Sequence, residues 1–141
     1  MQALLQLAQQ RPLIFVHLIA AVAALMLGAW LLARRPRGDT LHRRWGWAWV
    51  AAMGTAAVSS AFIRDVGMLN IAGFTPIHLL TVLVAVTLPR AIVDVRAGRV
   101  AAHRKAMKSL YAGGCIVAGL FTLMPGRFLG RLLWHGALGL V

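Results

Sequence analysis

The chain has 141 residues, of which 60% are hydrophobic and 13% are charged, and its mean hydropathy is +0.77. A soluble domain carries about 25% charged residues, so this composition excludes an ordinary soluble fold. The 15 Lys and Arg outnumber the 3 Asp and Glu, which gives a net charge of +12. A nucleic-acid-binding protein needs its basic residues on a solvated surface, whereas here they lie in short gaps between apolar stretches. The composition therefore predicts an integral membrane protein that lies in a lipid bilayer and binds no nucleic acid.

Four uncharged stretches are long enough to cross a bilayer. Each has close to the ~20 residues that an α-helix needs to span a hydrocarbon layer of ~30 Å. The first is too long for the apolar region of a signal peptide and is followed by Arg34 and Arg35, so we expect it to stay in the membrane. The sequence thus predicts an all-α, transmembrane four-helix bundle that forms a single domain over residues 1–141. The four stretches are 12–33, 45–63, 66–89 and 109–126.

The basic residues indicate the orientation of these helices. Residues 34–44 and 90–108 hold 11 of the 15 Lys and Arg, and loops rich in Lys and Arg tend to stay in the cytoplasm. Both loops are therefore predicted to be cytoplasmic, which places both termini outside. Trp45, Trp47 and Trp49 follow the first loop, and because indole rings favour the headgroup layer, we expect them to mark the cytoplasmic boundary.

Prolines and a glycine suggest where the helices begin and end. Pro12 and Pro76 suit the first turn of a helix, and the Gly-Asp-Thr of residues 38–40 is typical of a turn followed by an N-cap. Pro89 predicts either a kink or an early stop. The tail, residues 127–141, has basic and apolar residues at helical spacing and is expected to form a short amphipathic helix at the outer surface.

The sequence also contains an internal repeat. A shift of 61 residues places two histidines of the first half on two histidines of the second, and within each half the two histidines are 25 residues apart. Two crossings return the chain to its starting side, so the two copies share one orientation and are related by an axis along the membrane normal. Repeat one covers about 12–63 and repeat two about 74–126. The matched pairs are His17 with His78 and His42 with His103.

Imidazole is costly in hydrocarbon unless it is paired, so something is expected between the matched histidines. One hypothesis is haem b, with His17 and His78 as the iron ligands of an outer haem and His42 and His103 as those of an inner haem. Helix rise puts the two layers roughly 20 to 25 Å apart, and electrons would cross the membrane between them. Basic side chains beside the inner pair would neutralise the haem propionates. These are Arg43, Arg44, Arg104 and Lys105.

Other roles of the histidines stay open. The outer pair could instead hydrogen-bond to a neighbouring helix, with a partner such as Ser59 or Thr81, and the inner pair could contact lipid phosphate. Two to four histidines can also hold zinc or copper, although no carboxylate or cysteine lies near either layer. His135, in the tail, is expected on the surface.

Three functions are compatible with these features. The first is electron transfer through haem. The second is a non-redox membrane protein with structural histidines, either a small subunit of a larger membrane complex or a homo-oligomer. The third is a small-molecule transporter, although the lack of carboxylates within the spans argues against proton coupling. No catalytic residues are predicted, because the sequence has neither a Gly-rich phosphate loop nor a Ser-His-Asp set.

Several segments resemble a known family. The segments 42–47 (HRRWGW), 88–91 (LPRA), 103–107 (HRKAM) and 118–122 (AGLFT) are similar to those of a bacterial family of small predicted membrane proteins, domain of unknown function 2306. The resemblance covers nearly the whole chain and implies a multi-pass inner-membrane protein, but it brings no established activity. In arrangement, the two layers of histidines also resemble the diheme membrane cytochromes of the b561 type.

Overall fold

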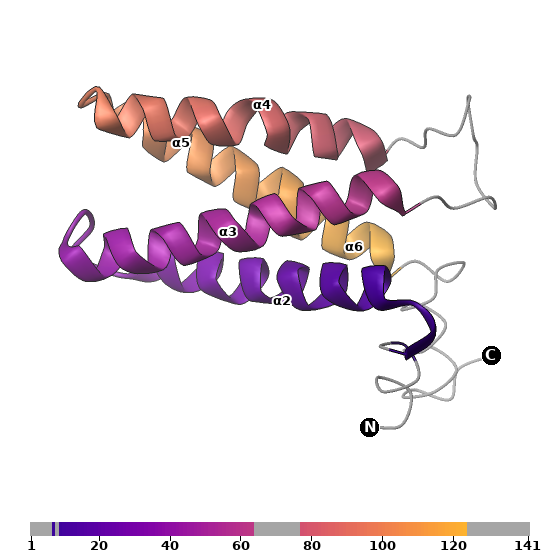
Figure 1. Cartoon of the computed structure of the whole chain (residues 1–141). Helices are drawn as coiled ribbons and strands as arrows, with labels where there is room; N and C mark the ends of the chain where they lie inside the picture. The colour runs from indigo at the N-terminus through magenta and orange to yellow at the C-terminus, as the bar shows by residue number, and fades with distance from the viewer. Residues whose placement is uncertain (1–6, 8, 64–76, 124–141) are drawn as a thin grey trace.

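A computed structural model describes residue 7, residues 9–63 and residues 77–123 of the chain. Its secondary structure over these residues is entirely helical, so the all-α expectation is confirmed. The last three elements follow one another without a break, and the described residues therefore form four helical rods (Figure 1). The elements are α2 (Pro12–Ala33), α3 (Thr40–Phe62), α4 (Ile77–Arg96), α5 (Val100–Leu110), the π-helix η1 (Tyr111–Val117) and α6 (Ala118–Thr122).

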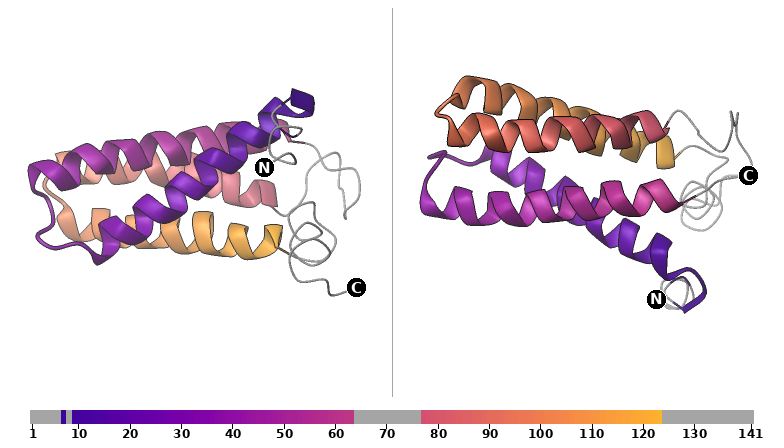
Figure 2. Two further views of the ribbon diagram at one scale, coloured as in Figure 1. Left: turned by 90° about the horizontal axis from the view of Figure 1, so that it is seen from below. Right: turned by 45° about the horizontal axis from the view of Figure 1, so that its top comes forward.

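The rods form two antiparallel hairpins. In the first, α2 packs on α3, and in the second, α4 packs on α5; α3 also contacts α4, and α2 contacts η1. The views of Figure 2 show α2 running obliquely across the other rods. Both short connections, residues 34–39 and 97–99, lie at the same end of the molecule, which we call the turn end (Figure 1).

The two turns are built in the same way. Each contains a glycine with a positive φ, +85° at Gly38 and +75° at Gly98, a conformation that other residues rarely adopt. Each is closed by an ion pair between residues five apart, at 2.7 Å between Arg34 and Asp39 and at 2.8 Å between Asp94 and Arg99. In the first turn the arginine precedes the aspartate in the sequence, whereas in the second turn the aspartate precedes the arginine.

The predicted helix starts can be compared with these elements. Pro12 begins α2, as expected. Asp39, within the predicted turn, is the N-cap of α3, and its carboxylate accepts a hydrogen bond of 2.8 Å from the backbone N–H of His42. The early stop at Pro89 is wrong, because α4 continues through it to Arg96. Pro76 and the tail 127–141 lie outside the described residues.

The centre of the molecule is the crossing of α2 over α3 and η1. The buried stripe of α2 consists of Ala20, Ala24, Gly28 and Leu31, and its small residues let the other rods come close. A Cβ at Gly28 would lie 2.5 Å from the ring of Tyr111 and 2.7 Å from Nε1 of Trp49. The helices can therefore pack at this distance only because residue 28 has no side chain.

Trp49 belongs to this crossing and not to the membrane boundary. Its side chain is 3% exposed, and its Nε1–H donates a hydrogen bond of 2.9 Å to the carbonyl of Ala24. Trp45 and Trp47 are both exposed, and Trp45 packs edge-on against Trp30. The expectation that all three tryptophans mark the headgroup layer is therefore wrong for Trp49, which lies one turn deeper than Trp45, where α2 crosses.

The outer surface of the rods is rich in large apolar side chains, such as Ile19 on α2, Val58 on α3 and Leu120 on α6. Apolar residues on the outside are expected where lipid is the solvent. Among the described helices, α2 alone is both long enough and apolar enough to cross a membrane. The helix α3 has Arg43 and Arg44 close to its start, α4 contains charges in its second half, and the fourth rod is interrupted by η1. The four crossings thus remain a prediction.

The crossing makes a first prediction. The substitution Gly28→Ala should destabilise the fold by about 1 to 3 kcal/mol, because the new methyl group overlaps two aromatic rings. Gly54→Ala is the matched control, since nothing lies within 4 Å of a Cβ at Gly54, and it should be neutral or stabilising by up to about 1 kcal/mol. Denaturant unfolding of the detergent-purified protein, followed by circular dichroism, measures both. Equal stability of the two variants would contradict this packing.

The first turn makes a second prediction, on acid stability. Hydrogen bonds from Arg34 lower the pKa of Asp39 from 3.8 to about 2, and the bond from the backbone N–H of His42 adds to this. Because folding lowers this pKa, the stabilisation is complete above pH about 4 and is lost as the pH falls towards 2. The melting temperature of the wild type should therefore fall more steeply over this range than that of Asp39→Asn. Parallel acid profiles of the two proteins would be inconsistent with this role.

Candidate functional site

Four histidines occupy the two ends of the bundle. His42 is in the first turn of α3 and His103 in the first turn of α5, so both lie at the turn end. His17, in the second turn of α2, and His78, at the start of α4, lie towards the opposite end. The side chain of His78 is outside the described part of the structure, as is His135. The hairpin topology thus brings the two histidines of each predicted pair to the same end of the molecule, and the structure describes the side chains of three of the four.

At the turn end, His42 and His103 lie close enough to interact electrostatically. Burial lowers the pKa of His42, and the positive charge of a protonated His103 lowers it further. The Nδ1 atom of His42 is buried, and no hydrogen-bond partner for it lies within the described chain. A buried polar nitrogen without a partner is costly and uncommon. Together these features mark His42 as the least satisfied polar side chain described.

His103 is held in a defined orientation. Its Nδ1–H donates a hydrogen bond of 2.9 Å to the carbonyl of Ala91, on the preceding helix. In a neutral imidazole, a proton on Nδ1 leaves Nε2 unprotonated, with a lone pair available to an acid or a metal. The backbone of α4 therefore selects the tautomer of His103.

His17 is anchored in the same way at the other end. Its Nδ1 lies 3.0 Å from both the carbonyl of Ala56 and Oγ of Ser59. The hydroxyl of Ser59, whose side chain is 4% exposed, donates to the carbonyl of Thr55 at 2.6 Å, so its oxygen accepts from His17. This is the helix-to-helix hydrogen bond that the sequence offered as an alternative for His17, with Ser59 as the partner. Thr81 instead bonds Ser60, at 2.8 Å between the two hydroxyl oxygens.

A hydrogen bond from Nδ1 to a carbonyl is compatible with two roles. Histidines that ligate metals almost always donate their second ring N–H in this manner, which fixes the ring and exposes Nε2. The same bond also stabilises a helix pair without any ligand. The described residues contain no group of three or more His, Cys, Asp or Glu that could hold a metal ion, so the zinc or copper alternative gains no support there.

The basic residues predicted to neutralise propionates are available at the turn end. All four are exposed, and none of their side chains forms a hydrogen bond or an ion pair with the described residues. They are therefore free to meet an anionic group on the surface. They are Arg43 and Arg44 on α3 and Arg104 and Lys105 on α5.

The π-helix η1 is a feature that sequence reasoning missed. It contains Gly113, Gly114 and Cys115, and the thiol of Cys115 donates to the sulfur of Met53 at 3.5 Å. A Cβ at Gly114 would lie 2.8 Å from the terminal methyl of Met53. The Gly-Gly pair was the available signal, since glycine weakens a regular α-helix and lets a neighbouring side chain come close, and π-helices occur mostly as single turns within α-helices. The buried thiol and thioether pack as soft apolar groups.

The bond from His17 makes a third prediction. In a double-mutant cycle with His17→Ala and Ser59→Ala, the two substitutions should show a coupling energy of about 0.6 kcal/mol, the average for hydrogen bonds between membrane helices, and at most about 1.7 kcal/mol. The cycle is measured by unfolding in detergent. As a control, the pair His17→Ala and Ser60→Ala should be additive, because Ser60 bonds Thr81 and not His17. Additivity in the first cycle would remove this contact from the fold.

Comparison with known proteins identifies the family. The family described as "Predicted membrane protein (DUF2306)" matches residues 14–133, which is most of the chain. No match was found among the curated proteins or among the solved structures. The family description agrees with the apolar composition and with the exposed apolar surface of the rods. The chain therefore belongs to the DUF2306 family of predicted membrane proteins.

Proposed function

We propose that this chain is a multi-pass protein of a bacterial inner membrane that binds haem b through paired histidines and transfers electrons across the bilayer. The observation that carries the proposal is the pair at the turn end. His42 and His103 come from different hairpins, lie within electrostatic range of each other, and include a buried nitrogen without a partner. Bis-histidine ligation of an iron porphyrin needs two imidazoles brought together from different helices.

The donor set at this end fits haem b. In the neutral imidazole of His103, Nε2 carries the lone pair because Nδ1–H is bonded to the carbonyl of Ala91. Burial lowers the pKa of His42, which favours the neutral form that ligation requires. Haem b, when bound, supplies one-electron oxidation and reduction at its iron. The chain orients the two rings, shields them from water, and offers the exposed side chains of Arg43, Arg44, Arg104 and Lys105 to the propionates.

Similarities between the two hairpins support a tandem repeat. Both turns use a glycine of positive φ followed by an ion-paired residue, and both sit at the same end. The turns and the buried positions of the first helix of each hairpin correspond at a spacing of 60 residues, one fewer than the 61 that matches the histidines, so His103 lies one position further into its helix than His42. The buried positions are Ala24, Gly28 and Leu31 in α2 and Val84, Leu88 and Ala91 in α4. Such a repeat gives each end one histidine from each copy, as two haem sites require.

The charge distribution supports the orientation of the bundle. The turn end carries the basic residues of both loops, and its two carboxylates, Asp39 and Asp94, are each bound by an arginine. This surplus of positive charge favours the cytoplasmic side. The second site would then lie near the outer face, with His17 held by Ala56 and Ser59 and His78 as the second ligand.

A second function is supported by the bond between His17 and Ser59. This contact satisfies His17 without any cofactor, as in a non-redox membrane protein with structural histidines. Such a protein would be a homo-oligomer or a small subunit of a larger complex. The exposed apolar side chains of the rods would then pack against protein as well as lipid.

The fourth prediction separates these functions. Wild-type protein purified from haem-supplied cells should show a Soret band and, when reduced, α and β bands of b-type haem, with two haems for each chain. His42→Ala and His103→Ala should each remove one haem and leave the other, because the two sites lie at opposite ends. His135→Ala is the matched control for the loss of an imidazole, and its spectrum should equal that of the wild type.

Circular dichroism of every variant establishes that the helices are intact. A folded wild-type protein that carries no haem after expression in haem-supplied cells would refute the cytochrome proposal and favour the structural role. Full haem content in the double variant His42→Ala, His103→Ala would refute the assignment of the inner site.

A further inference from the structure

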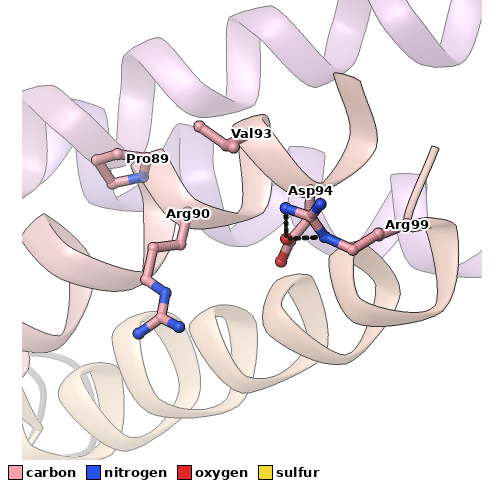
Figure 3. A pocket seen from close by; sticks show the side chains of 5 residues that line it. All are labelled: Pro89, Arg90, Val93, Asp94 and Arg99. Atoms are coloured by element: carbon pink, nitrogen blue, oxygen red, sulfur yellow. Dashed lines mark hydrogen bonds and ion pairs between the residues drawn. The ribbon is translucent and has the colours of Figure 1, made fainter. Parts of the chain in front are cut away.

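A small pocket opens beside Pro89, near the turn end. Its volume is about 250 Å³, and it is lined by Pro89, Arg90, Val93 and Asp94 of α4 and by Arg99, which precedes α5 (Figure 3). Nothing in the proposed electron transfer uses this pocket. It contains two guanidinium groups and one carboxylate, so its charge depends on how these three groups are paired.

The carboxylate of Asp94 already has an ion-pair partner, Arg99. Arg99 donates to Oδ1 of Asp94 from Nε at 2.9 Å and from Nη2 at 2.8 Å. Arg90 is exposed and has no hydrogen bond or ion pair with the described residues. Figure 3 shows its guanidinium extending away from the Asp94–Arg99 pair. The pocket therefore presents one uncompensated positive charge, which calls for an anion.

The depth of Arg90 indicates where that anion lies. Arg90 is six residues before Arg96, where α4 ends. These six residues place Arg90 about 9 Å from that end along the helix axis. Its exposed neighbours Val86 and Val93 are apolar, as expected of a surface that faces lipid. In Figure 3 the guanidinium lies on the side of Arg90 away from the turn end, so its flexible side chain would turn towards the headgroup layer to meet a phosphate, the available counter-charge there.

An apolar groove adjoins the pocket. It lies between α3 and α4, has a volume of about 350 Å³, and includes Ala57 and Ala61 on one side and Ala85 and Leu88 on the other. Pro89 lines both hollows. A cationic pocket next to an apolar groove matches the two parts of a phospholipid, a phosphate headgroup and an acyl chain.

We propose that an anionic glycerophospholipid binds here, with its phosphate against Arg90 and an acyl chain passing Pro89 into the groove between α3 and α4. A net negative headgroup is favoured over a zwitterionic one because the turn end carries eleven basic residues and two acids, both of which are already ion-paired. The site requires the membrane location of the family and is independent of haem.

The fifth prediction tests this site by native mass spectrometry of the full chain in detergent, titrated with phosphatidylglycerol. The wild type should bind phosphatidylglycerol more tightly than phosphatidylcholine. Arg90→Gln should weaken phosphatidylglycerol binding by about tenfold, which corresponds to about 1.4 kcal/mol. Arg35→Gln removes the same charge from an exposed residue of the first turn, outside the pocket, and should change binding by less than about twofold.

Two further measurements distinguish the contribution of the acyl chain from that of the phosphate headgroup. Ala61→Phe, which fills the groove, should weaken both lipids equally, whereas Arg90→Gln should abolish the preference between them. Inorganic phosphate should not compete at millimolar concentration. Equal losses in Arg90→Gln and Arg35→Gln would overturn the site in favour of a diffuse surface charge, and effective competition by phosphate would overturn the lipid in favour of a free anion. Circular dichroism verifies the fold of each variant.

Discussion

The close crossing at Gly28 is the constraint on which the other features depend. Trp49 of α3 and Tyr111 of η1 both pack against this one position of α2, so it fixes the two hairpins relative to each other. Trp49 follows His42 by seven residues and Tyr111 follows His103 by eight, about two helical turns in each case. When both aromatic rings are held at Gly28, the two histidines are aligned at the turn end.

Among the residues that the structure describes, nearly every polar group inside the bundle has a hydrogen-bond partner. Ser60 bonds Thr81 between α3 and α4, His17 bonds Ser59 between α2 and α3, and Thr122 bonds the carbonyl of its own helix at Ala118. In the hydrocarbon core of a bilayer, no water is present to form a hydrogen bond with a polar group that lacks a protein partner. The unmatched Nδ1 of His42 is therefore informative, because its cost is tolerated in a fold that satisfies comparable groups elsewhere.

Charge at the turn end is divided between structure and binding. Asp39 and Asp94 each bind the arginine five residues away and close a turn. Both aspartates in the described part of the chain are therefore already ion-paired. The remaining cations have no acidic partner in the described chain. The exposed residues beside His42 and His103 suit haem propionates, and Arg90, deeper along α4, suits a lipid phosphate.

The sequence by itself determined that the chain is helical, the turn at Gly38 and Asp39, and the placement of one histidine of each pair in each half, because these depend on local composition and on spacing along the chain. It set the later helix bounds wrongly: most of the predicted loop 90–108 is helical, since α4 ends at Arg96 and α5 begins at Val100, and charges do not stop a helix as they stop an apolar stretch. It did not determine which face of each helix is buried. The helix α2 is apolar on all sides, so polarity does not distinguish its buried side from its exposed side. Only the tertiary structure decided that Ala24 and Gly28 face the core, that Trp49 is buried with them, and that Ser59 is the partner of His17. The reason is physical: in a uniformly apolar chain, close packing of small residues and hydrogen bonds between helices select the buried face, and both depend on residues far apart in the sequence.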